Sequence, residues 1–386
     1  MVVRRNILPM RIVYVSPYDW AVPGGVNRHI EVLADLMTAL GHEVTIIAPA
    51  SAPVTTTNVQ VVADTVSLPA SGSQVRIAID PRIKRRINNI FADNQFDIVH
   101  LHEPFMPVIP LIALRASRRY NPGASNVATF HATRESGNPL YQIGKYFLTR
   151  SFDALDGRIA VSPTAQKYIQ RYFNGSIRII PNGIDINHWD DVNLDPIFSL
   201  LKDKKINILY VGRAEKRKGL EVLLEAFETI CTQRDDLRLV VVGPDSSNRR
   251  RYQANMSGSL AGNTTWVTNP TYTELPRYHR SCDIFVSPAT GNESQGYVLM
   301  EAMAAGLPII ASDISGYSHV VRHGKEGLLV SPNDSADLAR AIIQMADDPS
   351  LRKSLANYGE ERVKAYSWPT ISAELIDFYR ELIRAR

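Results

Sequence analysis

Cysteine is nearly absent from this chain, since only Cys231 and Cys282 occur among its 386 residues. Two cysteines are too few for the disulfide framework of a small secreted domain, and two buried thiols are the favoured interpretation. No apolar run approaches the ~20 residues that span a bilayer. The basic residues near the N-terminus are followed by no hydrophobic segment typical of a signal peptide. We therefore expect a cytoplasmic protein.

A strong charge of one sign is also missing. Lys and Arg total 43 and Asp and Glu total 39, a formal net charge of +4. This small excess is not the charge density of a protein that coats nucleic acid. Apolar residues make up 45% and charged residues 21%, which excludes wholesale disorder. The length predicts two or three domains.

Two common nucleotide-binding motifs are missing as well. The glycine pair Gly24-Gly25 is not part of a G-x-G-x-x-G fingerprint, and G-x-x-x-x-G-K-[ST] occurs nowhere. Their absence counts against dinucleotide-binding and P-loop functions.

What the chain has is an alternation of short β-branched runs with amphipathic stretches, which predicts an α/β fold with parallel sheets. We expect one strand–helix series over residues 1–183 and a second over residues 184–368. Residues 369–386 form one more helix whose apolar stripe (Ile371, Leu375, Phe378, Leu382 and Ile383) must dock on a neighbouring surface, and it is predicted to pack back on the first domain. The predicted strands are 12–15, 44–48, 98–101, 127–130, 159–161, 177–180, 208–211, 239–242, 265–267, 284–286, 309–311 and 328–330, and the predicted helices are 27–40, 81–91, 220–232, 296–305, 335–347 and 369–386.

Small, polar or charged residues follow these predicted strands. In open parallel sheets, ligands bind beyond the carboxyl ends of the strands, where helix N-termini also point. Gly24-Gly25 could bring backbone N–H groups to a diphosphate, although a tight turn is the favoured interpretation of the pair taken alone. Arg213 and Lys218 could neutralise the diphosphate leaving group of a nucleotide sugar, or could be solvated surface.

Glu293 and Glu301 flank the start of an apolar helix. Burial of a carboxylate in such a stretch costs several kcal/mol unless hydroxyls or cations satisfy it. Sugar hydroxyls are the favoured partners, one carboxylate for a hexose and one for a ribose. The alternative is that Glu293 caps the helix and that Glu301 pairs with a nearby Lys or Arg.

His131 ends a predicted strand at the ligand edge, where it could serve the site or be an ordinary core histidine. A metal site is disfavoured, because His100 and His102 alternate along a strand without a carboxylate or thiolate cluster of matching spacing.

At these residues the sequence resembles retaining glycosyltransferases of the GT-B fold, specifically family 4, and within that family the phosphatidylinositol α-mannosyltransferases. The resemblance covers nearly the whole chain from Met10. It depends on Gly24-Gly25, residues 180–185 (Ile-Pro-Asn-Gly-Ile-Asp), Gly212-Arg213 with Lys218-Gly219, and the two glutamates with seven residues between them. The segments 17–26, 102–104 and 128–131 and Asp313 also look like those of the mannosyltransferases.

The resemblance implies two Rossmann-like domains that face each other across a cleft, with the acceptor on the N-terminal and the nucleotide sugar on the C-terminal domain. It implies no metal and no other cofactor, and no side-chain nucleophile. The residues that it assigns to the donor are Gly24, Gly25, Arg213, Lys218, Glu293, Ser294, Gln295, Gly296 and Glu301. Those that it assigns to catalysis are His131, Arg213, Lys218 and Glu293. Tyr18 and Asn27 would contact the acceptor.

This sequence departs from the family at three places. Gln295 replaces the usual aromatic residue, the loop between Arg213 and Lys218 is one residue shorter, and Ala132, Arg134 and Glu135 replace a Thr/Ser-rich run. These departures concern the donor base and the acceptor. From the resemblance as a whole we expect transfer of a hexose, most simply mannose from GDP-mannose to phosphatidylinositol. A UDP-sugar enzyme with another lipid or soluble acceptor, and an idle homologue that only binds nucleotide sugar, stay open.

One further pattern concerns a membrane surface. Arg82, Lys84, Arg85 and Arg86 cluster at the start of a predicted helix that Asp80 would cap and in which Pro81 would occupy the first turn. The cluster could hold the chain on anionic lipid at the inner face of the cell membrane, as a comparable basic helix would in the mannosyltransferases, or it could be ordinary surface. The run of residues 249–251, all Arg, lacks interleaved aromatics, so we expect no nucleic-acid partner.

Overall fold

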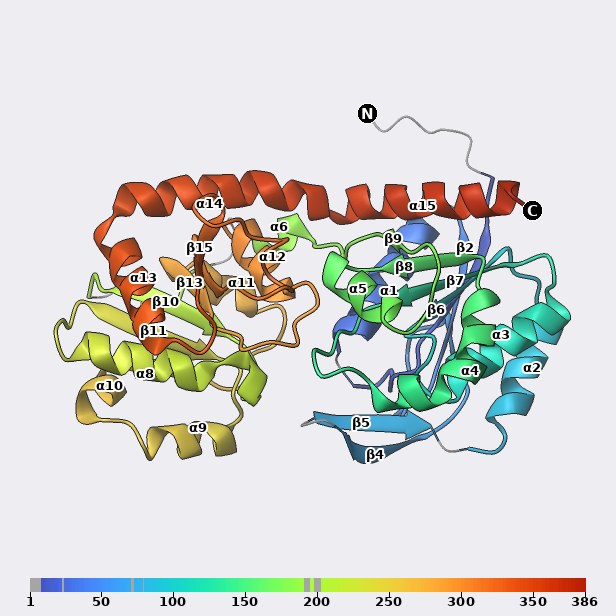
Figure 1. Cartoon of the computed structure of the whole chain (residues 1–386), viewed down its shortest axis with the longest axis horizontal. Helices are drawn as coiled ribbons and strands as arrows, with labels where there is room; N and C mark the ends of the chain where they lie inside the picture. The colour runs from blue at the N-terminus through green and yellow to red at the C-terminus, as the bar shows by residue number, and fades with distance from the viewer. Residues whose placement is uncertain (1–7, 23, 71–72, 79, 191–194, 198–202) are drawn as a thin grey trace. The chain divides into compact units, whose positions relative to one another are not determined.

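The structure, a computed structural model, describes residues 8–386 except 23, 71–72, 79, 191–194 and 198–202. The chain divides into two compact units. Unit 1 comprises Met1–Asn182 and Ile371–Arg386, and unit 2 comprises Gly183–Thr370. Each unit is an α/β layer structure built on a parallel sheet (Figure 1).

Unit 1 contains a seven-stranded parallel sheet in the order β3-β2-β1-β6-β7-β8-β9. Its strands are β1 (Arg11–Val15), β2 (Glu43–Ala48), β3 (Val59–Val61), β6 (Ile98–His102), β7 (Ser125–Phe130), β8 (Gly157–Ala160) and β9 (Arg178–Ile179). Its helices are α1 (Gly25–Ala39), α2 (Ile83–Asp93), α3 (Ile109–Tyr120), α4 (Pro139–Asp153) and α5 (Pro163–Gln170), and a separate antiparallel pair joins β4 (Thr65–Ala70) to β5 (Ser73–Ala78).

Unit 2 contains a six-stranded parallel sheet in the order β12-β11-β10-β13-β14-β15. Its strands are β10 (Ile206–Val211), β11 (Leu237–Val242), β12 (Thr264–Val267), β13 (Ile284–Ser287), β14 (Ile309–Ser312) and β15 (Gly327–Val330). Its helices are α6 (Ile186–Trp189), η1 (Lys216–Lys218), α8 (Leu220–Cys231), α9 (Ser246–Gln253), α10 (Gly258–Gly262), α11 (Leu275–His279), α12 (Tyr297–Ala304), α13 (Ser335–Asp347), α14 (Pro349–Val363) and η2 (Lys364–Tyr366).

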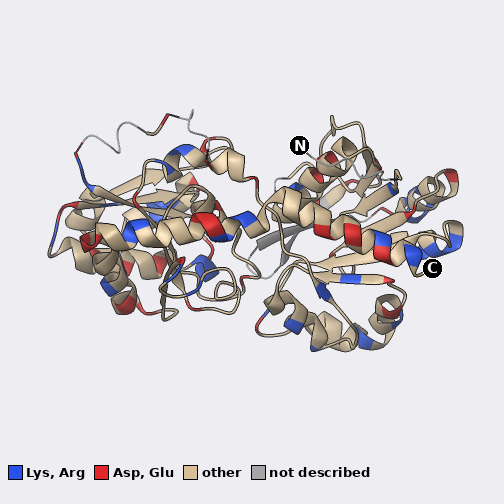
Figure 2. Ribbon diagram, turned by 90° about the horizontal axis from the view of Figure 1, so that it is seen from above, with Lys and Arg blue, Asp and Glu red and all other residues tan. Residues whose placement is uncertain are grey.

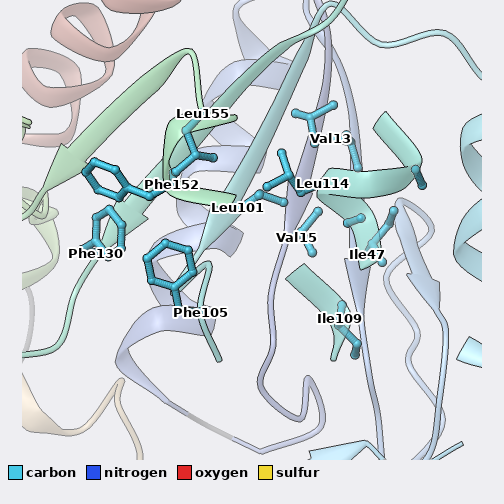
Figure 3. Packing of buried hydrophobic residues seen from close by; sticks show 14 of the residues in the cluster. Val13, Val15, Ile47, Leu101, Phe105, Ile109, Leu114, Phe130, Phe152 and Leu155 are labelled. Atoms are coloured by element: carbon cyan, nitrogen blue, oxygen red, sulfur yellow. The ribbon is translucent and has the colours of Figure 1, made fainter. Parts of the chain in front are cut away.

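The central strands of both sheets are buried on both faces, which explains why they are continuous apolar runs rather than alternating ones. In unit 1 one hydrophobic cluster joins one face of the sheet to α2, α3, α4 and α5: Val13, Val15 and Leu101 come from strands, whereas Ile109 and Leu114 come from α3 (Figure 3). All twelve predicted strands are present. Short β3 and the β4–β5 pair were not predicted.

Helix α15 (Trp368–Arg384) ends the chain and docks on unit 1 from Ile371 onward. Ile371 and Leu375 are buried, and Gly157 lies so close to Phe378 and Leu382 that an added Cβ would fall 2.6 Å from Leu382. The prediction was wrong for Ile383, which is 39% exposed. Tyr379, which is fully buried, belongs to the docked face of the helix instead. Acidic and basic residues are interspersed along this helix (Figure 2).

The start of α2 also differs from the prediction. The helix begins at Ile83 with Arg82 as the preceding residue, so Pro81 lies outside it. The Asp80 side chain does not cap a helical N–H; it accepts from the backbone N–H of Arg82 (2.8 Å) and from its guanidinium (3.0 Å). Asp80 therefore stabilises the turn that precedes α2 and does not cap the helix.

Candidate active site

The predicted donor residues of unit 2 lie at the point where the strand order reverses. Strand β10 pairs with β11 on one side and with β13 on the other. The loop after β10 carries Arg213 and Lys218, and the loop after β13 carries Glu293. Such a reversal point, at the carboxyl ends of parallel strands, is the usual ligand site of an open α/β sheet.

These two loops hold each other in place through the backbone. The N–H of Thr290 donates to the carbonyl of Arg217 at 2.8 Å. Gly219 has a φ of +70°, and a Cβ there would lie 1.8 Å from the carbonyl oxygen of Pro288. Only glycine therefore allows the loops to approach this closely.

A chain of ion pairs connects the loops. Lys218 Nζ lies 2.7 Å from Glu293 Oε1, and Arg217 donates to the same oxygen. Arg217 and Arg213 both pair with Glu215, at 2.8 and 2.9 Å. The Glu293 and Lys218 side chains are only 11% and 18% exposed, whereas Arg213 is 69% exposed. Three cations thus gather around two carboxylates, an arrangement that can accept a diphosphate.

Arg217 and Glu215 were not predicted. Arg217 is the middle residue of the basic run 216–218. The sequence does not indicate which of these three side chains points towards Glu293. The 3₁₀ turn η1 resolves this, because it leaves Lys216 exposed and directs Arg217 and Lys218 to Glu293.

Glu301 lies on α12, one residue before the buried Ala302. It is partly buried, and within the described residues its carboxylate forms no ion pair. Burial raises the pKa of Glu301 to about 7, and the charge of Lys218 opposes this rise. The alternative interpretation, in which Glu301 pairs with a nearby Lys or Arg, therefore finds no ion pair among the described residues: Lys218 acts on Glu301 only through its charge. The carboxylate is available to hydroxyl groups.

The remaining donor-site predictions, residues 294–296, lead into α12. Gln295 is buried, and its Nε2 lies 3.5 Å from Met300 Sδ. Gly296 has a φ of +70°, and a Cβ there would lie 2.6 Å from the Tyr317 ring. Gly296 therefore has a structural reason to be glycine, and the donor roles of Ser294, Gln295 and Gly296 stay predictions.

In unit 1 the glycine pair opens α1. Gly24 is the extended N-cap, without a side-chain cap, and Gly25 is the first helical residue. Both are exposed, and a Cβ at Gly25 would meet nothing within 4 Å. Packing within the unit does not require glycine at Gly25, so the open helix N-terminus fits close approach of an anion.

His131 follows β7 and is oriented by Glu103, which follows the neighbouring strand β6. Glu103 Oε1 accepts from the backbone N–H groups of His131 and Ala132, both at 2.6 Å. Glu103 is buried and has a φ of +48°, an unusual conformation for glutamate. This positioning role of Glu103 was not predicted, although a carboxylate directly after a predicted strand was a signal from which it could have been.

The His131 ring belongs to a histidine cluster. Its Nε2 lies 2.9 Å from His102 Nδ1, and its ring makes an edge contact with His29. Burial lowers the pKa of His131 to about 3, a shift that a hydrogen bond with Asn182 opposes. The imidazole is thus neutral at physiological pH and can exchange hydrogen bonds with a sugar hydroxyl.

The predicted acceptor residues Tyr18 and Asn27 lie near the end of β1. Asn27 is buried, with Oδ1 accepting from Ser16 Oγ (2.7 Å) and Nδ2 donating to the carbonyl of Asp19 (2.8 Å). Its amide therefore holds the loop after β1 to α1, and contact with an acceptor stays a prediction. Tyr18 is half-buried. Burial raises the pKa of its hydroxyl, and the negative charge of Glu103 raises it further by a smaller amount.

The basic cluster of α2 is smaller than predicted. Arg82 and Arg86 both pair with Asp80, at 3.0 and 3.4 Å, and Arg86 also donates to the carbonyl of Val62. Lys84 and Arg85 are exposed. Two of the four predicted basic side chains are therefore engaged within the unit.

Helix α4 presents an apolar face that was not predicted. Leu140, Ile143, Tyr146 and Phe147 are 70%, 84%, 69% and 74% exposed, while Tyr141 and Phe152 on its other side are buried. A helix that is apolar on both sides usually has a second partner.

The two sheets, the loops at their reversal points and the cation–carboxylate cluster define a glycosyltransferase of the GT-B class, and comparisons with known proteins agree. The profile "Glycosyltransferase Family 4" matches residues 23–188, and "Glycosyl transferases group 1" matches residues 193–362. The phosphatidyl-myo-inositol mannosyltransferase of Mycolicibacterium smegmatis is 33% identical over 96% of this chain and 93% of its own length. That of Mycobacterium leprae is 33% identical over 96% of both chains. The chain belongs to glycosyltransferase family 4.

Solved structures share the fold. A glycosyltransferase from Rickettsia africae superimposes with a TM-score of 0.76 at 20% identity, over 98% of this chain and 100% of that chain. The HepE protein of Anabaena in complex with UDP gives 0.75 at 16% identity, over 96% and 100%. Among the described helices of the present chain, none combines the length and the apolarity that a membrane crossing requires.

Proposed function

We propose that this glycosyltransferase transfers mannose from GDP-mannose to a lipid-linked polyol such as phosphatidylinositol. The observation that carries the proposal is the similarity to phosphatidyl-myo-inositol mannosyltransferases along 96% of the chain. The geometry of both units supports the same type of chemistry, because each offers hydrogen-bonding and charged groups at the carboxyl ends of its strands.

The donor diphosphate would bind the cations of unit 2. Arg213, Arg217 and Lys218 would neutralise the charge that develops on the diphosphate as the bond to the sugar breaks. Glu293 would hold hydroxyls of the transferred sugar, and Glu301 would hold the ribose. Neither role requires a metal ion, so the proposed reaction uses no cofactor.

The proposed residues of unit 1 serve the sugar and the acceptor. The backbone N–H groups at Gly24 and Gly25 would approach the diphosphate, and the neutral imidazole of His131 would hydrogen-bond the sugar next to the reacting carbon. The acceptor hydroxyl would attack the face from which the diphosphate leaves, and its proton would pass to a leaving phosphate oxygen. This order keeps the anomeric configuration without the carboxylate nucleophile of retaining glycosidases.

Association with a membrane surface is part of the proposal. The exposed apolar face of α4 lies beside Lys145 and Arg150, which are also exposed. An interfacial helix with this composition can insert its apolar side chains among lipid headgroups while its basic residues face anionic lipid. Lys84 and Arg85 on α2 would add about 1 kcal/mol each near such a surface.

The experiment that tests the donor and acceptor is a panel of GDP- and UDP-sugars, scored by thermal shift and by transfer to extracted lipids. We expect GDP-mannose to raise the melting temperature and to label a phosphatidylinositol product. Stabilisation by UDP-glucose alone would overturn the mannose assignment, and transfer to lipids other than phosphatidylinositol would overturn the acceptor.

A further inference from the structure

Three histidines from separate segments of unit 1 meet at one place. His29 comes from α1, His102 ends β6, and His131 follows β7. One ring nitrogen of each lies within 4.8 Å of the others. The cluster was not predicted from the sequence, because the three residues share no ligand-like spacing. A metal site was disfavoured for another reason, because no carboxylate or thiolate cluster of matching spacing accompanies His100 and His102.

The ring positions suit a common ligand. The centroid distances are 5.4 Å for His29–His102, 5.0 Å for His29–His131 and 5.2 Å for His102–His131. Three imidazoles that bind one tetrahedral ion through bonds of about 2.0–2.1 Å place their nitrogens about 3.4 Å apart and their centroids about 5 Å apart. The 2.9 Å contact between His102 Nδ1 and His131 Nε2 would therefore open by about half an ångström.

Within the described residues, the cluster includes a buried ring nitrogen that makes no hydrogen bond. His102 is fully buried, and its Nε2 has no hydrogen-bond partner among the described residues. A buried polar atom in this state costs about 1–3 kcal/mol. Because Nδ1 is the atom of His102 that faces His131, an ion would recover this free energy only if the ring turned over and presented Nε2.

The surroundings favour a cation over an anion. The buried carboxylate of Glu103 lies against the backbone of His131, where its negative charge would offset a divalent ion. The hydrogen bonds of His131 connect it to His102 and Asn182, both of which are uncharged partners. His131 is partly exposed, so an ion can reach the cluster and keep one position open.

We propose that His29, His102 and His131 form a binding site for a divalent transition-metal ion of the zinc type. Imidazole nitrogen suits Zn²⁺, Co²⁺, Ni²⁺ and Cu²⁺, whereas Mg²⁺ and Ca²⁺ require oxygen ligands. If His131 serves the transferred sugar, an ion bound here inhibits transfer instead of assisting it. That consequence rests on the proposed function, whereas binding of the ion does not.

The test uses the full chain after treatment with a chelator. Zn²⁺ is titrated in competition with a chromogenic chelator, and Co²⁺ is followed by the visible absorption of its tetrahedral complexes. We expect one ion per chain, a rise in melting temperature with Zn²⁺, and no response to Mg²⁺. Both readouts are independent of turnover, so they stand even if the transferase assignment fails.

Matched variants identify the ligands. His131→Gln lies at the edge of the cluster and should fold without difficulty, and His102→Gln removes the buried ligand. Each should weaken Zn²⁺ binding at least about 100-fold. Loss of a residue that only hydrogen-bonds a metal ligand already lowers metal affinity about 10- to 100-fold, and these variants remove a ligand itself. His42→Gln, a buried histidine of the same unit outside the cluster, should bind like the unaltered chain. Unchanged Zn²⁺ affinity in a folded His131→Gln chain, or less than one ion bound by the unaltered chain, would overturn the site.

Discussion

Lys218 and Glu293 form an ion pair that joins the loops after two adjacent strands, with Nζ 2.7 Å from Oε1. The same carboxylate oxygen also accepts from Arg217. Glu293 therefore fixes the positions of two cations before any donor is bound. A diphosphate that takes over these cations would release the carboxylate to the hydroxyls of the sugar.

This relationship predicts a separation of binding from turnover in Glu293→Gln. The amide keeps the shape and part of the hydrogen bonding, so the donor still binds, and the freed cations pair with its diphosphate. Turnover should fall by roughly 100-fold or more, the order expected when one oriented polar group is lost from an active site. Calorimetric binding of the donor and the initial rate of transfer measure the two effects.

The control for this experiment is Glu228→Gln, which changes an exposed glutamate of α8. It should leave both quantities unchanged. Full turnover in Glu293→Gln would remove Glu293 from the site.

Arg217 offers a second prediction with an adjacent control. Arg217→Ala should weaken donor binding about 10- to 100-fold, since a charge-assisted hydrogen bond contributes about 1.5–3 kcal/mol. Lys216→Ala removes an equal charge from an exposed position and should change donor affinity little. Equal losses in the two variants would mean that the loop acts only through its net charge.

The fold could be predicted from the sequence more completely than the candidate site. The strands were predictable because doubly buried strands are continuous β-branched runs, as in β11. Short β3 was not, because three residues give too little periodicity. In the site, Arg213 and Lys218 stand out in a basic loop, but the inward turn of Arg217 depends on the positive φ of Gly219 and on the packing of Pro288. The exposed face of α4 was missed for a related reason, because a helix that is apolar on both sides has no amphipathic pattern.

Glu301 predicts how stability depends on pH. Its pKa of about 7 exceeds the ordinary value of 4.5, so the folded chain binds the proton more tightly than the unfolded chain. The free energy of unfolding should therefore fall as pH rises from about 4.5 to about 7. For this one group the upper limit of that fall is roughly 3 kcal/mol.

The substitution Glu301→Gln isolates this effect. The variant should be more stable than the unaltered chain at pH 8 and similar to it at pH 5, as measured by urea unfolding. Glu225→Gln, an exposed change on α8, should show no such difference. Equal stabilities of Glu301→Gln and the unaltered chain at pH 8 would contradict the raised pKa.

Tyr379 predicts the energetic role of α15. Its hydroxyl lies 2.6 Å from His100 Nδ1, and His100 Nε2 lies 2.7 Å from Thr129 Oγ1. Tyr379→Phe leaves the buried imidazole nitrogen without this partner, which should lower the free energy of unfolding by about 1–3 kcal/mol. Tyr358→Phe, at an exposed position of α14, should have no measurable effect in the same denaturation experiment. An unchanged midpoint in Tyr379→Phe would show that the contact contributes nothing to docking of the helix.

The exposed face of α4 yields the last prediction. If Ile143 and Phe147 insert into the lipid interface, each contributes on the order of 1.5–3 kcal/mol, so the double substitution to Glu should reduce vesicle binding at least about 100-fold. Flotation with vesicles of phosphatidylcholine, with and without phosphatidylinositol, measures this loss. Lys84→Ser with Arg85→Ser should reduce binding only to the anionic vesicles, and less at high salt, because that contribution is electrostatic. Tyr358→Glu places a charge on an exposed aromatic position of unit 2 and should float as the unaltered chain does. If the α4 variant also floats unchanged, this helix is not the lipid-binding surface, and its apolar face must contact another partner.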